Sequence, residues 1–391
     1  VLQFVRENDV KFIRLAFCDI TGSQKNIAIM AQELPRAFER GIGFESPNVL
    51  GLERIQHADL FLVPDCSTIS ILPWRPAHER VMRMYCDVCY ADGTPFEDTG
   101  RAILQQATQR AADLGYICRV GTECEFYLFR TDENGNPTNE LFDHGTYADM
   151  APLDRGENIR REICLALEAM GLQPESSYHE QGPGQNEVDF RYSDPLSAAD
   201  NAVTFLTVVK TIAARNGLYA DFSPRPLEGR PGSGFHINMS VQGGADDLMH
   251  RVMGGILDKI ADMTLFLNPT EPSYSRLGAH KAPKYISWSS NNRSQLIRVP
   301  AASGEYRRFE LRSPDCTANP YLAFALLIWA GLSGIENGIA LPEACNVNLH
   351  TADSRNVTLA TLPKSLSDAE KCAADSNFIA QHLPQSLIEF F

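Results

Sequence analysis

Paired carboxylates at two-residue spacing stand in the middle of the chain. In the run Val120–Phe129, Glu123 and Glu125 alternate with Cys124 and Phe126. Residues two apart in a β-strand point to the same face, so a strand here would carry both carboxylates on one face and apolar residues on the other. Taken alone, such a pair is also typical of a solvated sheet face.

The same alternation appears in three later segments, each with apolar residues at the intervening positions. The polar positions are Glu187 and Asp189, then His236, Asn238 and Ser240, then Arg308, Glu310 and Arg312. Strands that are polar on one face and apolar on the other predict a sheet that curves around a polar cavity.

A tight loop is predicted between Glu180 and Glu187. The intervening Gln-Gly-Pro-Gly-Gln-Asn has a Gly-Pro-Gly core, which excludes a continuous helix or strand. Such a loop lets two carboxylates an odd number of residues apart face the same site.

Carboxylates that converge in a cavity require a cation. They repel one another, and their loss of hydration costs several kcal/mol each unless a positive charge is present. Oxygen ligands with one imidazole favour Mg²⁺ or Mn²⁺. An ion that keeps water and substrate oxygens in its shell suits nucleotide phosphate chemistry.

Two domains are predicted to position these residues. Short β runs such as Val10–Phe17 and Arg80–Tyr90, divided by turn-rich pieces, indicate a small α+β domain over residues 1–95. A turn-rich segment then leads into Arg101–Leu114, whose apolar spacing predicts an amphipathic helix. Residues 96–391 alternate strands with helices such as Ile159–Met170, which predicts an α+β domain on a mostly antiparallel sheet.

The composition narrows the class of protein. With 49 acidic and 35 basic residues the net charge is -14, which disfavours nucleic acid or an anionic membrane surface as a partner. The longest apolar stretch, Tyr321–Ile335, is shorter than the roughly twenty residues of a membrane span and is predicted to be a buried helix. Nothing at the start is typical of a signal peptide, and Val1 in place of Met indicates that residues precede it; the expected compartment is the cytoplasm.

The ten cysteines have no framework spacing and are predicted to be reduced thiols. Cys86 and Cys89 form a Cys-x-x-Cys pair, but they lie in a predicted strand, where residues three apart point to opposite faces. A core position is therefore favoured over a metal or redox role for this pair.

Four motifs, in order, resemble the glutamine synthetase family over about residues 10–390. They are Glu123-Cys-Glu125, His179-Glu180 through Gly184-Gln185-Asn186-Glu187, Gly232-Ser-Gly-Phe-His236, and Asn292-Arg293 through Arg298-Val-Pro300 to Arg308-Phe-Glu310-Leu-Arg312-Ser-Pro-Asp315. The resemblance is to type I members. His350 stands where adenylylated members carry a modifiable Tyr, and the short spacing from Glu180 to Glu187 also resembles the non-adenylylated branch.

The resemblance implies a fold and an activity. The fold is a β-grasp-like N-terminal domain and a catalytic domain on a curved, mostly antiparallel sheet flanked by helices. The activity is that of an ATP-dependent glutamate–ammonia ligase acting through γ-glutamyl phosphate, with ATP as co-substrate and two or more Mg²⁺ or Mn²⁺ ions per site. Members form stacked rings, a hexamer or a dodecamer, in which a neighbour's N-terminal domain completes each site.

The resemblance also implies roles for individual residues. One ion, facing the substrate carboxylate, would be held by Glu125, Glu180 and Glu187, and the other, on the ATP phosphates, by Glu123, His236 and Glu310. ATP would be bound by Arg293, Arg298, Arg308 and Ser240, because the sequence has no Gly-x-x-x-x-Gly-Lys-Ser/Thr loop. The acid would be bound by Gly232, Arg276, Arg312 and Glu180. The residues expected to take part in catalysis are Arg276, Arg293, Arg312, Lys281 and Glu45.

The expected ammonium pocket departs from the family pattern. Glu45 replaces an Asp, which keeps the charge, whereas Lys281 replaces a flap Glu and reverses it. An ammonium group there would repel ammonium ion and favour a neutral or differently charged nucleophile. Pro231, where the family commonly has Asn, leaves the identity of the acid open as well.

Three alternatives therefore stand beside the glutamate–ammonia ligase. The first is a γ-glutamyl-amine ligase that uses an amine other than ammonia. The second is a catalytically silent homologue that forms rings. The third sets the resemblance aside and is a metal-binding sheet protein without nucleotide.

Overall fold

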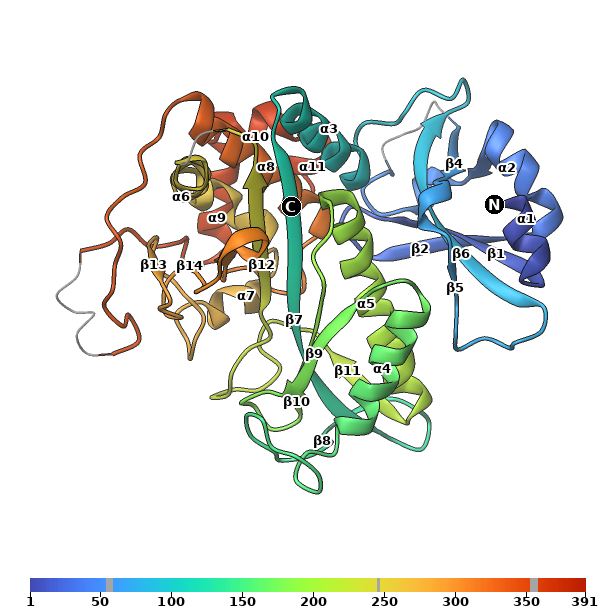
Figure 1. Cartoon of the computed structure of the whole chain (residues 1–391), viewed down its shortest axis with the longest axis horizontal. Helices are drawn as coiled ribbons and strands as arrows, with labels where there is room; N and C mark the ends of the chain where they lie inside the picture. The colour runs from blue at the N-terminus through green and yellow to red at the C-terminus, as the bar shows by residue number, and fades with distance from the viewer. Residues whose placement is uncertain (54–58, 245–246, 352–357) are drawn as a thin grey trace.

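Two β-sheets of unequal size organise the chain, as the computed structural model shows for residues 1–53, 59–244, 247–351 and 358–391 (Figure 1). The smaller sheet lies at the N-terminal end, and the larger one forms the centre of the rest of the chain. This α+β arrangement confirms the predicted fold class.

The N-terminal sheet has the strand order β2-β1-β6-β4-β3, and β5 pairs with β6. Its strands are β1 (Val10–Cys18), β2 (Gln24–Met30), β3 (Ile42–Phe44), β4 (Leu60–Pro64), β5 (Ser70–Ile71) and β6 (Arg80–Tyr90). The pairing of β1 with β6 is parallel and the other pairings are antiparallel. Beside these strands lie α1 (Leu2–Glu7), α2 (Leu34–Arg40) and the 3₁₀ turns η1 (Ala31–Glu33), η2 (Ser46–Asn48) and η3 (Cys66–Thr68).

The larger sheet has the strand order β13-β14-β15-β12-β7-β10-β9, with β8 and β11 also paired to β7. Its strands are β7 (Ile117–Thr131), β8 (Pro137–Leu141), β9 (Pro174–His179), β10 (Gln185–Phe190), β11 (Leu218–Asp221), β12 (Phe235–Gln242), β13 (Trp288–Ser290), β14 (Ile297–Val299) and β15 (Phe309–Leu311). Only β13 and β14 pair in parallel. The sheet is therefore mostly antiparallel, as predicted, and β7 runs through its middle (Figure 1).

Helices cover one face of the larger sheet. The helices of this part of the chain are α3 (Gly100–Asp113), α4 (Glu157–Ala169), α5 (Pro195–Arg215), α6 (Leu248–Leu267), α7 (Glu271–Arg276), α8 (Pro320–Glu336), α9 (Leu366–Ala374), α10 (Asn377–His382) and α11 (Gln385–Ile388), with the 3₁₀ turn η4 (Gly304–Tyr306). Of these, α3, α4, α5, α6 and α8 contact the strands of the sheet. Helix α5 begins where the Asp194 side chain accepts a hydrogen bond from the backbone N–H of Ser197, and Pro195 follows in the first turn.

The covered face is the apolar one. Phe126 of β7 packs on Phe205 of α5, with ring centres 6.2 Å apart, and Phe235 of β12 stacks on Phe324 of α8 at the same distance. Helix α8 is buried along nearly its whole length, as predicted for the apolar stretch. Among the helices of the described residues, none combines the length and the apolar character that crossing a membrane requires. The opposite face of the sheet is left for polar residues.

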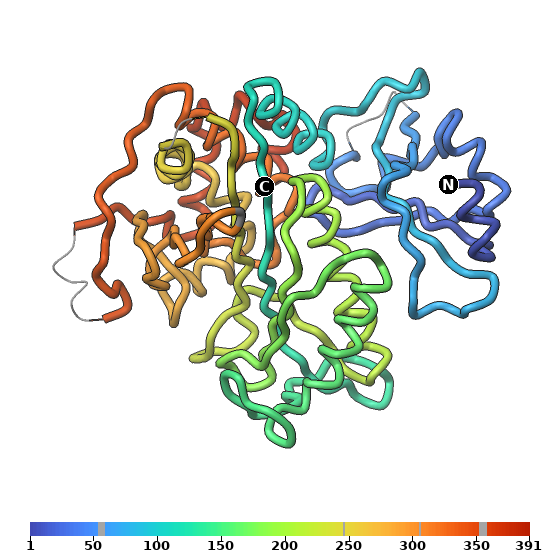
Figure 2. The backbone as a smooth tube through the Cα atoms, in the orientation of Figure 1, coloured from blue at the N-terminus to red at the C-terminus, as the bar shows by residue number. Residues whose placement is uncertain are grey.

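An ion cluster joins the N-terminal sheet to the helices. Arg101 of α3 is 7% exposed and pairs with Asp65 at 2.7 Å, with Asp200 of α5 at 3.2 Å, and with Asp87 of β6. The trace in Figure 2 shows the N-terminal region lying at one side of the molecule, next to α3. Because the carboxylates come from both parts of the chain, Arg101 fixes how the two parts meet.

All ten cysteines are free thiols. Cys86 and Cys89 lie in β6, and both are buried.

Candidate functional site

A cavity of about 250 Å³ opens on the polar face of the larger sheet. All but two of the predicted site residues line it, namely Glu123, Glu125, Glu180, Glu187, Gly232, His236, Arg276, Lys281, Arg293, Arg298, Arg308, Glu310 and Arg312. They come from segments spread over nearly 200 positions of sequence. The sheet pairing brings these segments together.

Strand register places the chemical groups in rows across the sheet. Glu125 of β7 lies opposite Glu187 of β10. One step along, Glu123 lies between Asp189 of β10 and His236 of β12. Directly opposed positions in antiparallel strands have Cβ atoms about 5 Å apart. The alternation predicted from the sequence therefore produces two adjacent rows of acidic and imidazole groups.

The first group of possible metal ligands is Glu125, Glu180 and Glu187, whose ligand atoms lie within 4.8 Å of one another. Hydrogen bonds orient Glu125, because its Oε2 accepts from Gln185 Nε2 at 3.1 Å and from the Gly234 backbone N–H at 2.9 Å. Glu180 accepts from the backbone N–H of Gln181 at 2.8 Å.

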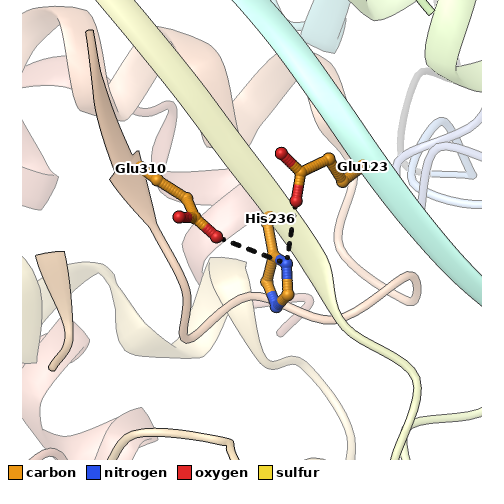
Figure 3. Close-up of side chains that lie close together, drawn as sticks. All are labelled: Glu123, His236 and Glu310. Atoms are coloured by element: carbon orange, nitrogen blue, oxygen red, sulfur yellow. Dashed lines mark hydrogen bonds and ion pairs between the residues drawn. The ribbon is translucent and has the colours of Figure 1, made fainter. Parts of the chain in front are cut away.

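The second group is Glu123, His236 and Glu310, again within 4.8 Å (Figure 3). His236 Nδ1 lies 3.2 Å from Glu123 Oε2 and 3.6 Å from Glu310 Oε1. Asn238 donates to Glu123 Oε1 at 2.8 Å. Each of the three side chains comes from a different strand, β7, β12 or β15.

The acids of the cavity differ in the direction in which their pKa is shifted. Burial, followed by the charges of Glu125 and Asp189, raises the pKa of Glu187 well above its ordinary value. Burial also opposes ionisation of Glu123, but the hydrogen bond to His236, the charge of His236, the hydrogen bond from Asn238 and the charge of Arg312 together outweigh it and lower the pKa of Glu123 to about 2. Like charges held this close ionise together only when a cation neutralises them, and the oxygen-rich ligand set suits a hard divalent ion. The two groups therefore fit the chemistry of a divalent metal site.

Arginines surround the second group. Glu310 is 1% exposed, accepts from Arg298 Nη1 at 2.7 Å, and is also paired with Arg312. The Nε atoms of Arg298 and Arg312 are buried, and neither has a hydrogen-bond partner among the described residues. These guanidinium groups retain donors for an anionic substrate.

Arg276 is held differently. It is 4% exposed, it donates to the backbone carbonyl of Ser313 at 2.7 Å, and burial lowers its pKa. It makes no ion pair with a carboxylate within the parts of the chain that the structure describes. A buried guanidinium without a counter-ion at the wall of a cavity is suited to bind a carboxylate.

A buried ionic network holds the loop between Glu180 and Glu187. His179 is fully buried, its Nε2 lies 2.8 Å from Asp143 Oδ1, and its Nδ1 lies 2.7 Å from the carbonyl oxygen of Glu180. Burial opposes the charged form of His179, but the bonds to Asp143 and to the Glu180 carbonyl outweigh it and raise the pKa of His179. Asp143 also accepts from the backbone N–H of Gly184 at 3.0 Å. The Asp143 carboxylate thus holds both ends of the loop, through His179 at one end and through Gly184 at the other.

Asp143, His179 and Asp154 form a third group of closely spaced side chains. Asp154 is paired with the buried Arg160, whose Nη1 also donates to Asn186 at 2.5 Å. Because hydrogen bonds and a guanidinium already satisfy these carboxylates, we interpret this group as structural rather than as a metal site.

Lys281, Ser240 and Glu45 lie at three different places in the structure. Lys281 lies at the cavity wall, close enough to act electrostatically on Glu180; burial and Glu125 nevertheless outweigh it and raise the pKa of Glu180. Ser240 lies in an adjoining cavity, which shares Glu123 and Arg308 with the first. Glu45 lines neither cavity. It is exposed in the N-terminal part of the chain and accepts from Asn48 at 2.6 Å.

Sequence reasoning did not assign several residues of this cavity and of the adjoining one. Gln185 bonds to Glu125, Asn238 bonds to Glu123, and Arg308 Nε donates to Asn238 Oδ1 at 2.9 Å. Tyr178 and Asp189 also line the wall. The alternation carried a signal for Asn238 and Asp189, because both share a face with a predicted ligand, but amide and carboxylate groups are common on any solvated sheet face.

Family models match nearly the whole chain. The model described as the glutamine synthetase β-grasp domain matches residues 9–91, and the model described as the glutamine synthetase catalytic domain matches residues 97–391. The relative named glutamine synthetase from Methanosarcina mazei is 45% identical over 409 residues, covering 100% of this chain and 91% of the relative. The one from Clostridium saccharobutylicum is 44% identical over 386 residues, covering 94% of this chain and 87% of the relative.

A solved structure is similar in three dimensions. The structure titled GmaS/ADP complex, conformation 1, superposes with a TM-score of 0.90 at 29% sequence identity, covering 100% of this chain and 93% of that one. The family models, the full-length relatives and the predicted motifs agree. This chain belongs to the glutamine synthetase family.

Proposed function

We propose that the chain is an ATP-dependent ligase that converts glutamate and ammonia into glutamine through γ-glutamyl phosphate. The observation that carries the proposal is the cavity itself, where two groups of three metal-ligand side chains adjoin guanidinium groups with donors to spare. Relatives that carry the name glutamine synthetase match this chain along its length at 40–45% identity.

Glu125, Glu180 and Glu187 would hold one divalent ion, and Glu123, His236 and Glu310 a second. Mg²⁺ or Mn²⁺ would neutralise the carboxylates and the negative charge on the phosphates. The chain fixes the ligand geometry through hydrogen bonds to the ligands themselves, such as those from Gln185 to Glu125 and from Asn238 to Glu123.

Arginines would supply the positioning that phosphoryl transfer requires. Arg293, Arg298 and Arg308, with Ser240 in the adjoining cavity, would bind ATP. Arg276, Arg312 and Gly232 would bind glutamate. An oxygen of the glutamate γ-carboxylate attacks the γ-phosphorus of ATP, and the bond to ADP breaks.

The second half-reaction joins nitrogen to the acyl carbon. Ammonia attacks the carbonyl carbon of γ-glutamyl phosphate, the carbon–oxygen bond breaks, and phosphate leaves with the oxygen that came from glutamate. The nitrogen loses one proton, to the departing phosphate or to solvent, and the neutral amide results. Lys281 stands at the cavity wall and Glu45 lies elsewhere in this copy of the chain. We therefore propose that Glu45 completes the site of a second copy, in a ring of six or twelve chains.

The N-terminal domain would comprise residues 1–95 and the catalytic domain residues 96–391. We place the reaction in the cytoplasm.

Among the alternatives, the relatives favour ammonia over another amine, and they do not favour a catalytically silent homologue. A panel experiment tests this choice. Glutamine and γ-glutamyl amides are measured after incubation with glutamate, ATP, Mg²⁺ and either ammonium or one of several alkylamines. Ammonium is expected to give a higher kcat/KM than every alkylamine.

The variant Lys281→Glu gives this panel an internal comparison. It replaces a cation at the cavity wall with an anion, so the KM for ammonium is expected to fall by about tenfold. An alkylamine that outperforms ammonium with the unaltered chain would overturn the proposed nucleophile, and no product with any amine would overturn the ligase activity.

A further inference from the structure

A separate cavity, of about 260 Å³, lies at the seam between the N-terminal sheet and helix α5. The N-terminal part contributes Arg14 of β1, Arg75 of the loop after β5, and Arg83 of β6. Helix α5 contributes Thr204, Thr207 and Thr211. The glutamine synthetase motifs do not include any of these residues.

Arg83 is the most buried of the three arginines, at 6% exposure. Its guanidinium lies 4.0 Å from the centre of the Tyr85 ring, and its Nη1 donates to Thr204 Oγ1 at 2.6 Å. Its Nε is buried and has no hydrogen-bond partner among the described residues. A buried charged donor left unpaired costs free energy unless a ligand satisfies it.

The seam cavity has an excess of positive charge. No Asp or Glu belongs to its lining, and within the described parts of the chain Arg14, Arg75 and Arg83 make no ion pair with a carboxylate. Burial raises the pKa of Asp200, and the charge of Arg83 partly opposes that rise. Asp200 is, however, already paired with Arg101, and it accepts a hydrogen bond from Tyr321 Oη at 2.6 Å. The charge of Arg83 is therefore not matched by a paired acid.

Hydrogen bonds hold the residues on both sides of the seam cavity in place. Arg215 of α5 donates to the carbonyl oxygen of Trp74 at 2.8 Å, which holds the loop bearing Arg75 against the helix. Thr207 Oγ1 donates to Gln24 Oε1 at 2.9 Å across the seam. Arg14 Nη1 donates to Asn26 Oδ1 at 3.2 Å. The arginines thus stand on elements that are fixed relative to one another.

We infer that the seam cavity binds a small dianion, either a phosphate or a dicarboxylate. Guanidinium forks bind both anions through paired N–H···O bonds, and the threonine hydroxyls on α5 add neutral donors. The bound anion would bridge the N-terminal sheet and α5, the helix whose Phe205 packs against Phe126 of β7. Binding would therefore stabilise the union of the two parts of the chain.

Calorimetric titration of the full-length protein tests this inference. Inorganic phosphate and succinate are titrated separately, with saturating Mg²⁺, glutamate and a non-hydrolysable ATP analogue present, so that the glutamate and γ-phosphate positions of the first cavity are both occupied. Acetate serves as the singly charged comparison. Saturable binding of phosphate, of succinate or of both is expected, and the tighter of the two identifies the class of dianion.

Arg75→Gln is the informative variant because Arg75 is exposed and its replacement leaves the core intact. It is expected to weaken dianion binding at least about tenfold, the usual effect of losing one charge-assisted contact. Arg161→Gln, at an exposed position of α4, removes the same charge elsewhere and is expected to change nothing. Arg83→Gln is a second variant that removes the buried guanidinium. If this variant does not fold, Arg75→Gln still tests the inference.

Two results would overturn the inference. One is the absence of saturable binding of either dianion in the millimolar range. The other is equal binding by the Arg75→Gln and Arg161→Gln variants, which would indicate attraction to net charge alone. Neither result bears on the ligase activity, since the titration is made with the first cavity filled.

Discussion

In the first cavity, the Glu187 carboxylate is buried although burial disfavours its charged form. Glu187 is 3% exposed and lies opposite Glu125 across two strands. Its raised pKa reflects burial first and neighbouring carboxylates second. A bound divalent ion would neutralise these carboxylates. Without metal, the unaltered protein should therefore be less stable than a variant in which one of the carboxylates is replaced by a neutral side chain.

Glu187→Gln is predicted to have opposite effects on the two forms of the protein. Without metal, the melting temperature should rise by about 2 °C or more, because one repulsive charge is lost. With Mg²⁺ or Mn²⁺, the stabilisation of the unaltered protein, about 2.7 kcal/mol at a hundredfold excess over Kd, should largely disappear. Thermal unfolding with EDTA and with metal measures both effects.

Glu168→Gln, an exposed substitution on α4, is the control for removal of one negative charge. If Glu187→Gln keeps the full stabilisation by metal, Glu187 is not a ligand.

At the scale of elements, the strands were more predictable than the loops. Alternation located β7, β10 and β12, because period two leaves a direct trace in a strand with one covered face. The parts that escaped prediction depend on long-range contacts. Asp143, 36 residues before His179, binds both ends of the loop from Glu180 to Glu187, and no local pattern marks such a pair.

Asp143→Ala is predicted to destabilise this loop together with the fold around it. It leaves the buried His179 without its carboxylate partner, and breaking a buried pair by removing one partner typically costs about 3–5 kcal/mol. Chemical denaturation measures the free energy of unfolding. As a control, Asp149→Ala removes a half-buried carboxylate nearby that accepts hydrogen bonds from Thr146 and forms no part of the His179 network, and it is expected to cost less. Equal costs for the two variants would contradict the role given to Asp143.

The docking of helix α10 is predicted to depend on pH. His382 stacks on Trp329 of α8, with ring centres 4.3 Å apart, and burial lowers the pKa of His382 from 6.5 to about 4. Between these two values the unfolded chain binds a proton that the folded chain does not, so this contribution to stability falls as pH drops from 6.5 towards 4.

His382→Gln should therefore flatten the loss of stability in this pH range, as measured by urea midpoints. His78→Gln replaces an exposed histidine and should leave the slope unchanged. A slope that stays the same in His382→Gln would contradict the assignment.

At the scale of the whole molecule, the domain boundary after residue 95 stays a prediction, and the seam between the N-terminal sheet and the helices was not predicted. Arg101 and the seam cavity lie where segments more than 100 positions apart meet, so their partners could not be derived from local pattern. Glu45 poses the same difficulty between chains, because its proposed site belongs to another copy.

Mixing two inactive variants is predicted to restore activity. Glu45→Ala impairs the residue contributed to a neighbour, and Arg312→Ala impairs the cavity itself. If subunits are dissociated, mixed and reassembled in equal amounts, roughly a quarter of the sites should have two intact halves. Glutamine formation by the mixture, compared with each variant alone, measures the recovery. A mixture no more active than its components would contradict a site shared between copies.

Activation of glutamate as an acyl phosphate predicts where the oxygen atoms of glutamate go. The most direct measurement follows an oxygen atom from the γ-carboxylate of ¹⁸O-labelled glutamate during turnover with ATP, Mg²⁺ and ammonium. Attack by that carboxylate on ATP, followed by displacement with ammonia, transfers one labelled oxygen to each phosphate released. Mass spectrometry of the phosphate should therefore show one ¹⁸O atom per molecule, and none when glutamate is unlabelled. Phosphate released without label, or at the same rate without glutamate, would contradict this activation.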